Sequence, residues 1–228
     1  MVVLWTSCTH ARHRIGYLCP VLDTIAGTTL ALTTRALAAA RPASKPLHPR
    51  GRVVVGTLRR RGLTSPTGVG WLDAAGRDEV LVRLSRAVGL PGPLPDIHGL
   101  ALRVPVDGGG HGDLLLASTG WSPAGRFVLT ASRRLADRPL TTLLPYRTLV
   151  GPLLLGARAE GEERFELSLA VGAGAWSPFA TLELTTTDAD PLVSFDPVRN
   201  QVPGLEQYPW VVRLREPSYA VARRSRRG

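Results

Sequence analysis

The 228-residue chain has two cysteines, one methionine and one lysine, and no long apolar run. Cys8 and Cys19 both lie among the first twenty residues, so no disulfide framework can staple the rest of the chain. A zinc site formed by these cysteines with His10 and His13 is conceivable, but the spacing fits no established ligand pattern. The 44% hydrophobic and 20% charged residues are typical of a globular protein and exclude disordered, collagen-like and multi-span membrane classes. The length predicts one domain with a short appendage.

Positive charge comes almost entirely from arginine. The 28 basic residues exceed the 18 acidic ones and give a net charge of +10, with Lys45 as the single lysine. This composition, rich also in Ala, Gly, Pro and Leu, favours a solvated arginine-rich surface over a dedicated anion-binding one. We therefore expect no specific binding of nucleic acid.

Residues 1–45 differ from the rest of the chain. Between Leu22 and Ala40 the apolar residues have a loosely helical spacing that ends at Arg41-Pro42. Arg35 and several threonines interrupt the segment, which excludes a transmembrane span, and the features of a signal peptide are missing. We expect an N-terminal arm, helical or partly disordered, on a cytoplasmic protein.

Residues 46–228 are predicted to be mainly β-strands. Short β-branched or alternating runs recur every 10 to 20 residues between Gly, Pro and Asp clusters, which is typical of an antiparallel sandwich or barrel. The expected strands include Val53–Val55, Val80–Leu84, Leu100–Val106, Asp113–Ser118, Phe127–Leu129, Leu153–Leu155, Phe165–Ala170 and Thr181–Thr185. Gly108–Gly112 predicts a hairpin or flexible loop. We expect a short helix around Pro139–Leu144 and another from about Arg215, with Pro217 in its first turn.

Common hydrolytic motifs are missing from this body. It has three histidines, His48, His98 and His111, and contains neither Gly-x-Ser-x-Gly nor His-Glu-x-x-His. A hydrolytic metal centre would need more ligands than the sequence concentrates anywhere.

Five short strings occur in a particular order. They are Leu47-His48-Pro49-Arg50-Gly51, Val82-Arg83-Leu84-Ser85, Pro95–Arg103, Gly112-Asp113-Leu114 and Arg215-Glu216-Pro217-Ser218-Tyr219. In order and spacing they resemble the haem catalase superfamily, and more closely its small catalase-like members than the full-length catalases. The resemblance covers roughly residues 46–226. It implies an α+β fold: an antiparallel β-barrel of catalase-like type with a few peripheral helices, binding haem b.

The resemblance implies a distal side formed by the first two strings. His48 takes the place of the histidine that passes a proton between the two peroxide oxygens, and Ser85 that of the serine orienting it. Arg83 would bind a haem propionate through charge-assisted hydrogen bonds. Since Arg83 alternates with Val82 and Leu84, it points into the barrel if those two face an outer layer. The alternatives are that His48 is a surface histidine, that Ser85 is an ordinary strand hydroxyl and that Arg83 is a solvent-facing arginine.

The last string implies the proximal side. Arg215 and Tyr219 are four residues apart, so a helix would place them on one face, where the guanidinium favours phenolate. In the resemblance Tyr219 is the ligand of ferric iron, and Arg226, slightly favoured over Arg223, meets a propionate. The alternative for Tyr219 is a packing residue on an amphipathic helix.

One departure affects the expected activity. The place of the family's distal asparagine falls at about Ala117, and efficient catalase activity depends on that amide. We therefore expect a haem-dependent peroxidase-like protein that acts on hydrogen peroxide or organic hydroperoxides with weak true catalase activity. The alternatives are a haem carrier or sensor, and a haem-free binding module on the same barrel. Assembly of the chain into a homo-oligomer is compatible with this expectation.

Overall fold

The computed structural model describes residues 50–89, 93–190 and 193–224. Most of these residues form antiparallel strands. In chain order the strands are β1 (Arg50–Arg61), β2 (Ala75–Arg86), β3 (His98–Val106), β4 (Gly110–Ser118), β5 (Leu140–Thr141), β6 (Tyr146–Thr148), β7 (Gly151–Ala159), β8 (Arg164–Val171), β9 (Ser177–Asp188) and β10 (Glu206–Gln207). The helices are α2 (Gly70–Asp73), the 3₁₀ turns η1 (Gly125–Phe127) and η2 (Leu135–Asp137), and α3 (Pro209–Arg224).

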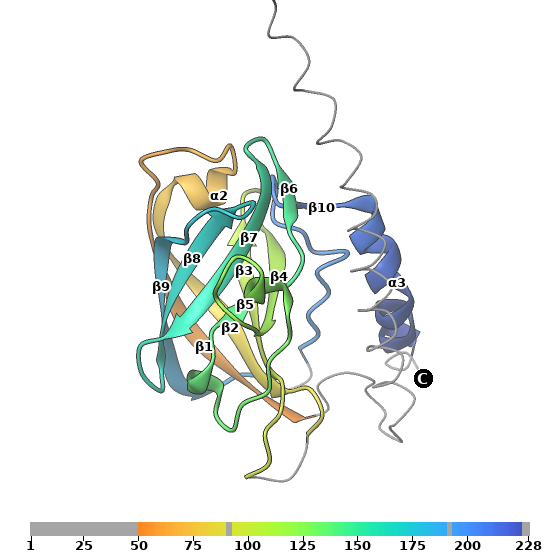
Figure 1. Ribbon diagram of the computed structural model, residues 1–228. Coiled ribbons are helices and arrows are strands. Elements are labelled where there is room, and N and C mark those ends of the chain that lie inside the picture. The colour runs from red at the N-terminus through yellow and green to blue at the C-terminus, as the bar shows by residue number, and fades with distance from the viewer. Residues whose placement is uncertain (1–49, 90–92, 191–192, 225–228) are drawn as a thin grey trace, which may run out of the picture. The chain divides into compact units, whose positions relative to one another are not determined.

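Eight of the described strands close into a barrel (Figure 1). Their order is β7-β5-β4-β3-β2-β1-β9-β8, and β8 returns to pair with β7. Pairing is antiparallel throughout, and β6 and β10 extend the sheet from β7. Because closure leaves no free edge in the ring, every strand of the barrel pairs on both sides.

The barrel interior is the hydrophobic core. Alternate residues of each strand point inward, as a period of two requires. On β2, Val80 and Val82 are buried in the core, and on β3, Leu100 and Leu102 are buried in the same way. The short helix α2 adds Leu72, fully buried, to this cluster. The predicted antiparallel β-barrel with few helices is confirmed, and so is the predicted hairpin, where Gly108 and Gly109 have φ values of 85° and 83°.

Two predicted elements near the middle of the chain are wrong. Phe127–Leu129 was expected to be a strand, but Phe127 ends η1, and Leu129 forms only an isolated bridge to Thr119. The turn is fixed by Arg126, which is 1% exposed and donates to the carbonyls of Gly172 and Gly174 at 3.2 and 3.0 Å. Pro139–Leu144 was expected to be helical, but the short strand β5 lies there because its backbone pairs with both β4 and β7.

The C-terminal helix begins earlier than predicted. It starts at Pro209 and not near Arg215, so Pro217 lies inside α3 and not in its first turn. Pro209 suits the first helical position because the N–H that proline lacks would have no intrahelical partner there. Val211, which is 1% exposed, anchors the first turn. No helix of the described residues is long and apolar enough to cross a membrane.

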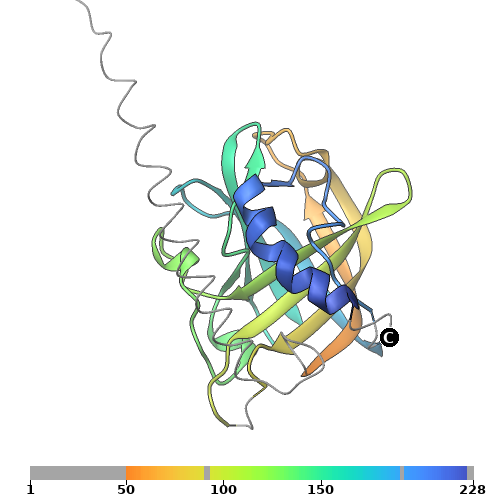
Figure 2. The ribbon, with the colours of Figure 1, turned by 90° about the vertical axis from the view of Figure 1, so that its right-hand side faces the viewer.

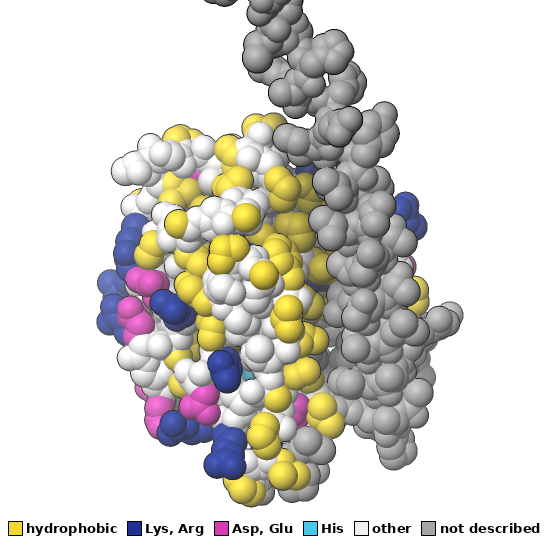
Figure 3. All heavy atoms as spheres, in the orientation of Figure 1, with side chains coloured by type: hydrophobic (Ala, Val, Ile, Leu, Met, Phe, Trp, Pro, Cys, Tyr) yellow, Lys and Arg dark blue, Asp and Glu magenta, His cyan; other side chains and the backbone are white. Residues whose placement is uncertain are grey.

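Charged side chains of both signs alternate on the side of the barrel formed by β8 and β9 (Figure 3). Arg164 pairs with Glu160 at 2.8 Å and with Glu183 at 3.5 Å, and Arg61 pairs with Glu166 at 3.6 Å. The exposed arginines of this side therefore face acidic neighbours, and they do not form a single-sign patch there.

Two tryptophans cover β7 from outside. The rings of Trp121 and Trp176 stack with centroids 4.2 Å apart, and the guanidiniums of Arg158 and Arg126 lie over their outer faces. Gly156 makes room for the pair: a Cβ there would lie 2.7 Å from Trp121 and 3.0 Å from Trp176.

This close approach yields the first prediction. Gly156→Ala should destabilise the protein by about 1–3 kcal/mol, because overpacking forces both rings to move. Gly161→Ala is the matched control, since a Cβ at Gly161 meets nothing within 4 Å. Urea denaturation followed by tryptophan fluorescence measures both, and equal midpoints for the two variants would contradict the assigned role of Gly156.

Candidate functional site

The predicted site residues divide into those that the structure describes and those that it does not. His48, Arg226 and the whole N-terminal arm, residues 1–45, lie outside the described residues. Arg83 and Ser85 lie on β2, and Arg215 and Tyr219 lie on α3.

The register of the first four strands aligns small residues in one row. Gly51 on β1 is the cross-strand partner of Ser85, Ser85 of Gly99, and Gly99 of Ala117 on β4. Directly opposed residues project to the same side of a sheet. The positions of the predicted distal residues, Ser85 and Ala117, are therefore two strands apart on one face.

That face is the outside of the barrel. Val82 is fully buried in the core and Leu84 packs against it, so Arg83 and Ser85 project outward. The condition under which Arg83 would point into the barrel is thus not met. Gly51 gives Arg83 its path across β1, because a Cβ at Gly51 would lie 2.7 Å from the Arg83 Nε. The Ser85 Oγ lies 3.5 Å from the Gly99 carbonyl oxygen, a long hydrogen bond.

Helix α3 crosses the outer face of these strands. Figure 1 shows the helix beside the barrel, and Figure 2, turned by 90°, shows it in front of the strands that follow β1. Arg215 and Tyr219 therefore belong to the same side of the barrel as the row of small residues.

The phenol of Tyr219 lies in a charged environment. Burial raises its pKa to about 12, the Arg215 guanidinium lowers it, and the charges of Asp196 and Asp113 raise it. The effect of Arg215 has the direction predicted from its spacing, but the effect of burial is larger, so the Tyr219 phenol loses its proton less readily than a free tyrosine does. Burial also raises the pKa of the Tyr146 phenol, and Arg215 lowers it.

A buried ion pair, which sequence reasoning did not predict, lies beside this helix. Asp113 is the cross-strand partner of Arg103, and its side chain is 0% exposed. Arg103 Nε and Nη2 donate to Asp113 Oδ1 and Oδ2 at 2.8 and 2.9 Å. Such a bidentate pair is strong and geometrically specific.

The same carboxylate holds the segment that leads to α3. Asp113 Oδ2 also accepts the backbone N–H of Asp196 and the Asn200 Nδ2, both at 2.7 Å. Arg103 donates to the Ser194 carbonyl oxygen and lies over the Phe195 ring, 5.2 Å from its centroid. We name Arg103, Asp113, Ser194, Asp196 and Asn200 the Asp113 clasp. It joins β3 and β4 to residues 194–200.

Further hydrogen bonds extend the clasp to α3. The Gln207 Nε2 donates to the Pro197 carbonyl oxygen, and the Gln207 Oε1 accepts from Arg215 Nη1 at 3.4 Å. The position of Arg215 therefore depends on residues far apart in the sequence. In the sequence, only the string Gly112-Asp113 points to this contact. Gly112 lets the segment that the clasp holds come close to β4, because a Cβ at Gly112 would lie 2.4 Å from the Val202 Cγ2 of that segment.

The row Gly51, Ser85, Gly99 and Ala117 carries small side chains, but the Arg83 side chain lies across it at Gly51. Tyr219, beside Arg215, is an oxygen donor of the type that ferric haem accepts. Within the described residues, no group of three or more His, Cys, Asp or Glu could hold a metal ion.

The chain matches no known protein family, and no curated protein is similar to it in sequence. Its functional assignment therefore depends on the residues and geometry described above.

The Asp113 clasp yields the second prediction. Asp113→Ala should cost about 3 kcal/mol of stability, because it leaves the partly buried Arg103 guanidinium without its carboxylate. Glu160→Ala, which breaks an exposed pair with Arg164, should change stability by less than about 1 kcal/mol. Chemical denaturation compares the two, and a similar small loss for both would refute a dominant role for the clasp.

Proposed function

We propose that residues 46–228 form a catalase-like haem-binding domain with peroxidase-like activity. The observation that supports it most is the row Gly51–Ser85–Gly99–Ala117 on the outer face that α3 crosses with Arg215 and Tyr219. Two strings that are 130 residues apart in the chain thus belong to one side of the barrel. The resemblance to the catalase superfamily assigns these positions to opposite sides of a haem.

In this proposal the proximal residues hold the cofactor. Tyr219, once deprotonated, would be the ligand of a ferric haem, and Arg215 would offset the negative charge of its oxygen. Arg83, and Arg226 beyond the described residues, would bind the propionates by charge-assisted hydrogen bonds. A bound haem would supply redox-active iron for the reaction with peroxide.

The distal residues move and hold protons. In this proposal His48 would take a proton from one peroxide oxygen and return it to the other, and Ser85 would orient the His48 ring. Ala117, opposite Gly99, supplies no amide to position a small peroxide. The activity expected from this set is turnover of organic hydroperoxides with weak disproportionation of hydrogen peroxide.

A haem-free binding module on the same barrel is the second candidate. The observation that favours it is the pKa of the Tyr219 phenol, raised to about 12, since a protonated phenol is a poor ligand. Ferric iron must therefore displace a tightly held proton. A non-catalytic haem carrier or sensor would share the spectrum of the enzyme and differ only in turnover.

The third prediction tests haem binding. Titration of the purified full chain with hemin should give a Soret band that saturates at one haem per chain. Tyr219→Phe should weaken retention strongly or change the spectrum, whereas Tyr208→Phe, immediately before the same helix, should do neither. Absence of a saturable band from the unmodified chain would overturn the haem proposal in favour of the binding module.

The same hemin titration distinguishes the iron ligand from the acid–base residue. His48→Ala should retain haem and lose about 100-fold or more in the rate of reaction with peroxide, the usual scale of general acid–base catalysis. Loss of haem in His48→Ala with full retention in Tyr219→Phe would reverse the assignment of ligand and acid–base residue.

The fourth prediction concerns the substrate. kcat/KM for a long-chain organic hydroperoxide should exceed that for hydrogen peroxide, because each buried CH₂ contributes about 0.8 kcal/mol. Ala117→Asn should raise oxygen evolution from hydrogen peroxide, and Ala117→Ser, which adds a polar group without an amide, should raise it less. Vigorous oxygen evolution by the unmodified protein would show that the missing amide does not limit the reaction.

A further inference from the structure

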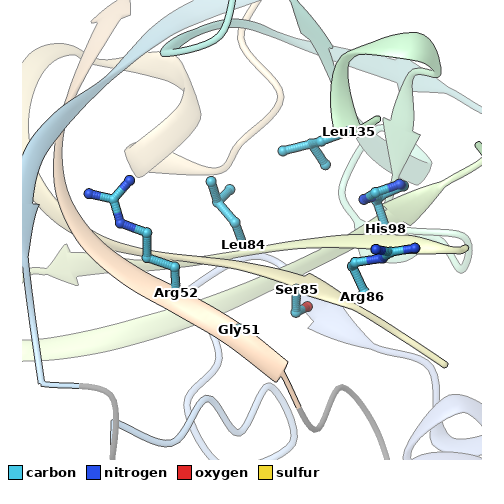
Figure 4. A pocket seen from close by; sticks show the side chains of 7 residues that line it. All are labelled: Gly51, Arg52, Leu84, Ser85, Arg86, His98 and Leu135. Carbon is cyan, nitrogen blue, oxygen red and sulfur yellow. The ribbon is translucent and has the colours of Figure 1, made fainter. Parts of the chain in front are cut away.

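The interior of the barrel ends in a cavity of about 320 Å³, where β1 begins and β2 ends (Figure 4). Leu84 and Leu135 form its apolar walls and pack against the hydrophobic core, and His98 lines it from β3. The volume lies at the lower end of the range for small-ligand pockets, and apolar walls with a few placed polar groups are typical of such sites.

His98 brings one hydrogen-bond acceptor to this cavity. It stands two residues before Leu100 in the inward-facing row of β3, and it is 7% exposed. Its Nε2 lies 3.1 Å from the Ser132 carbonyl oxygen, which can only accept, so the hydrogen of the neutral imidazole is on Nε2. Nδ1 then carries a lone pair, and it makes no hydrogen bond within the described part of the chain.

The arginines at the opening already have carboxylate partners. Arg52 pairs with Asp188 at 2.6 Å, and the Arg86 Nε lies 3.6 Å from Asp96. Arg86 also donates from Nη2 to the Leu94 carbonyl oxygen at 2.8 Å. A charged ligand would lose its hydration here without gaining an unpaired counter-charge, so the opening favours an uncharged one.

The chemistry left to the cavity is one acceptor between apolar walls. A hydrocarbon chain would cover Leu84 and Leu135 and remove them from water. A hydroxyl at the end of that chain would donate to His98 Nδ1, whereas an ether oxygen could not, because it carries no hydrogen. The cavity therefore matches a molecule that is apolar along its length and has a single O–H donor.

We propose that this cavity binds an uncharged single-chain molecule that ends in a hydroxyl group, such as a medium-chain alcohol. The hydroxyl donates to His98 Nδ1, and the chain lies along Leu84 and Leu135. The site belongs to the barrel alone and needs no haem, so it goes beyond the proposed function.

The fifth prediction compares two isomers by calorimetric titration of the full chain without haem. At about pH 8, above the usual titration range of imidazole, octanol should bind saturably and about fivefold more tightly than heptyl methyl ether. The two molecules contain the same atoms, and only octanol carries a hydroxyl hydrogen. A fivefold difference corresponds to one ordinary hydrogen bond.

Substitutions of His98 test the acceptor. In His98→Gln the amide can still donate to the Ser132 carbonyl oxygen from near the position of Nε2, but it offers no acceptor at the position of Nδ1. The preference for octanol should therefore disappear. His98→Asn, whose side-chain oxygen lies near the position of Nδ1, should keep part of it. His111→Gln, the same change at an exposed histidine, is the control and should bind both isomers as the unmodified chain does.

A cavity-filling variant tests the location. Leu135→Trp should abolish binding of both isomers while the circular dichroism spectrum stays unchanged, and undiminished binding would overturn the assignment to this cavity. Equal affinity of the unmodified chain for the two isomers, no saturable binding of octanol, or an undiminished preference in His98→Gln would overturn the role of His98. Tighter binding of octanoate than of octanol would overturn the uncharged assignment. The hemin titration is independent of all these results, so either proposal can fail alone.

Discussion

The carboxylate of Asp113 joins the barrel to the segment that leads to α3. It is buried on β4 and accepts two hydrogen bonds from Arg103 and two from the segment before α3. Burying an unpaired carboxylate would cost several kcal/mol, and these four donors offset that cost. Hydrogen bonds through Pro197 and Gln207 continue from this segment to Arg215, so Asp113 is connected to the Arg215 side chain of α3.

Strand alternation made much of the barrel predictable, and tertiary hydrogen bonds made the rest unpredictable. In Leu100–Val106 and Phe165–Ala170 the apolar residues alternate with a period of two, and these segments form the strands β3 and β8. Residues 127–129 have the same apolar composition but form no strand, since Arg126 is held by the carbonyls of Gly172 and Gly174, more than forty residues away. Nothing near Arg126 in the sequence indicates that contact.

The candidate site was predictable in composition but not in orientation. Alternation places Arg83 and Ser85 on one face of the strand and Val82 and Leu84 on the other. The pattern is the same whichever of the two faces lies inside the barrel. The orientation is decided by Val80 and Val82, which pack with Leu102 and other interior residues into the core. The role of Asp113 was missed because it requires Arg103 across the hairpin and Asp196 from a distant segment to meet one carboxylate.

The two faces of β2 have opposite chemical character. Leu84 faces the cavity at the end of the barrel, while Ser85 projects to the opposite side, toward the face that α3 crosses (Figure 4). A shift of β2 by one residue would exchange them, placing a hydroxyl and Arg83 against the core and leucine against the outer layer. Gly51 and Gly56 favour the observed register, because a Cβ at either position would lie within 3.1 Å of neighbouring atoms of β2 or β9. The same backbone constraint therefore sets the polarity of both faces of β2, and a change of the β2 register cannot alter one face without altering the other.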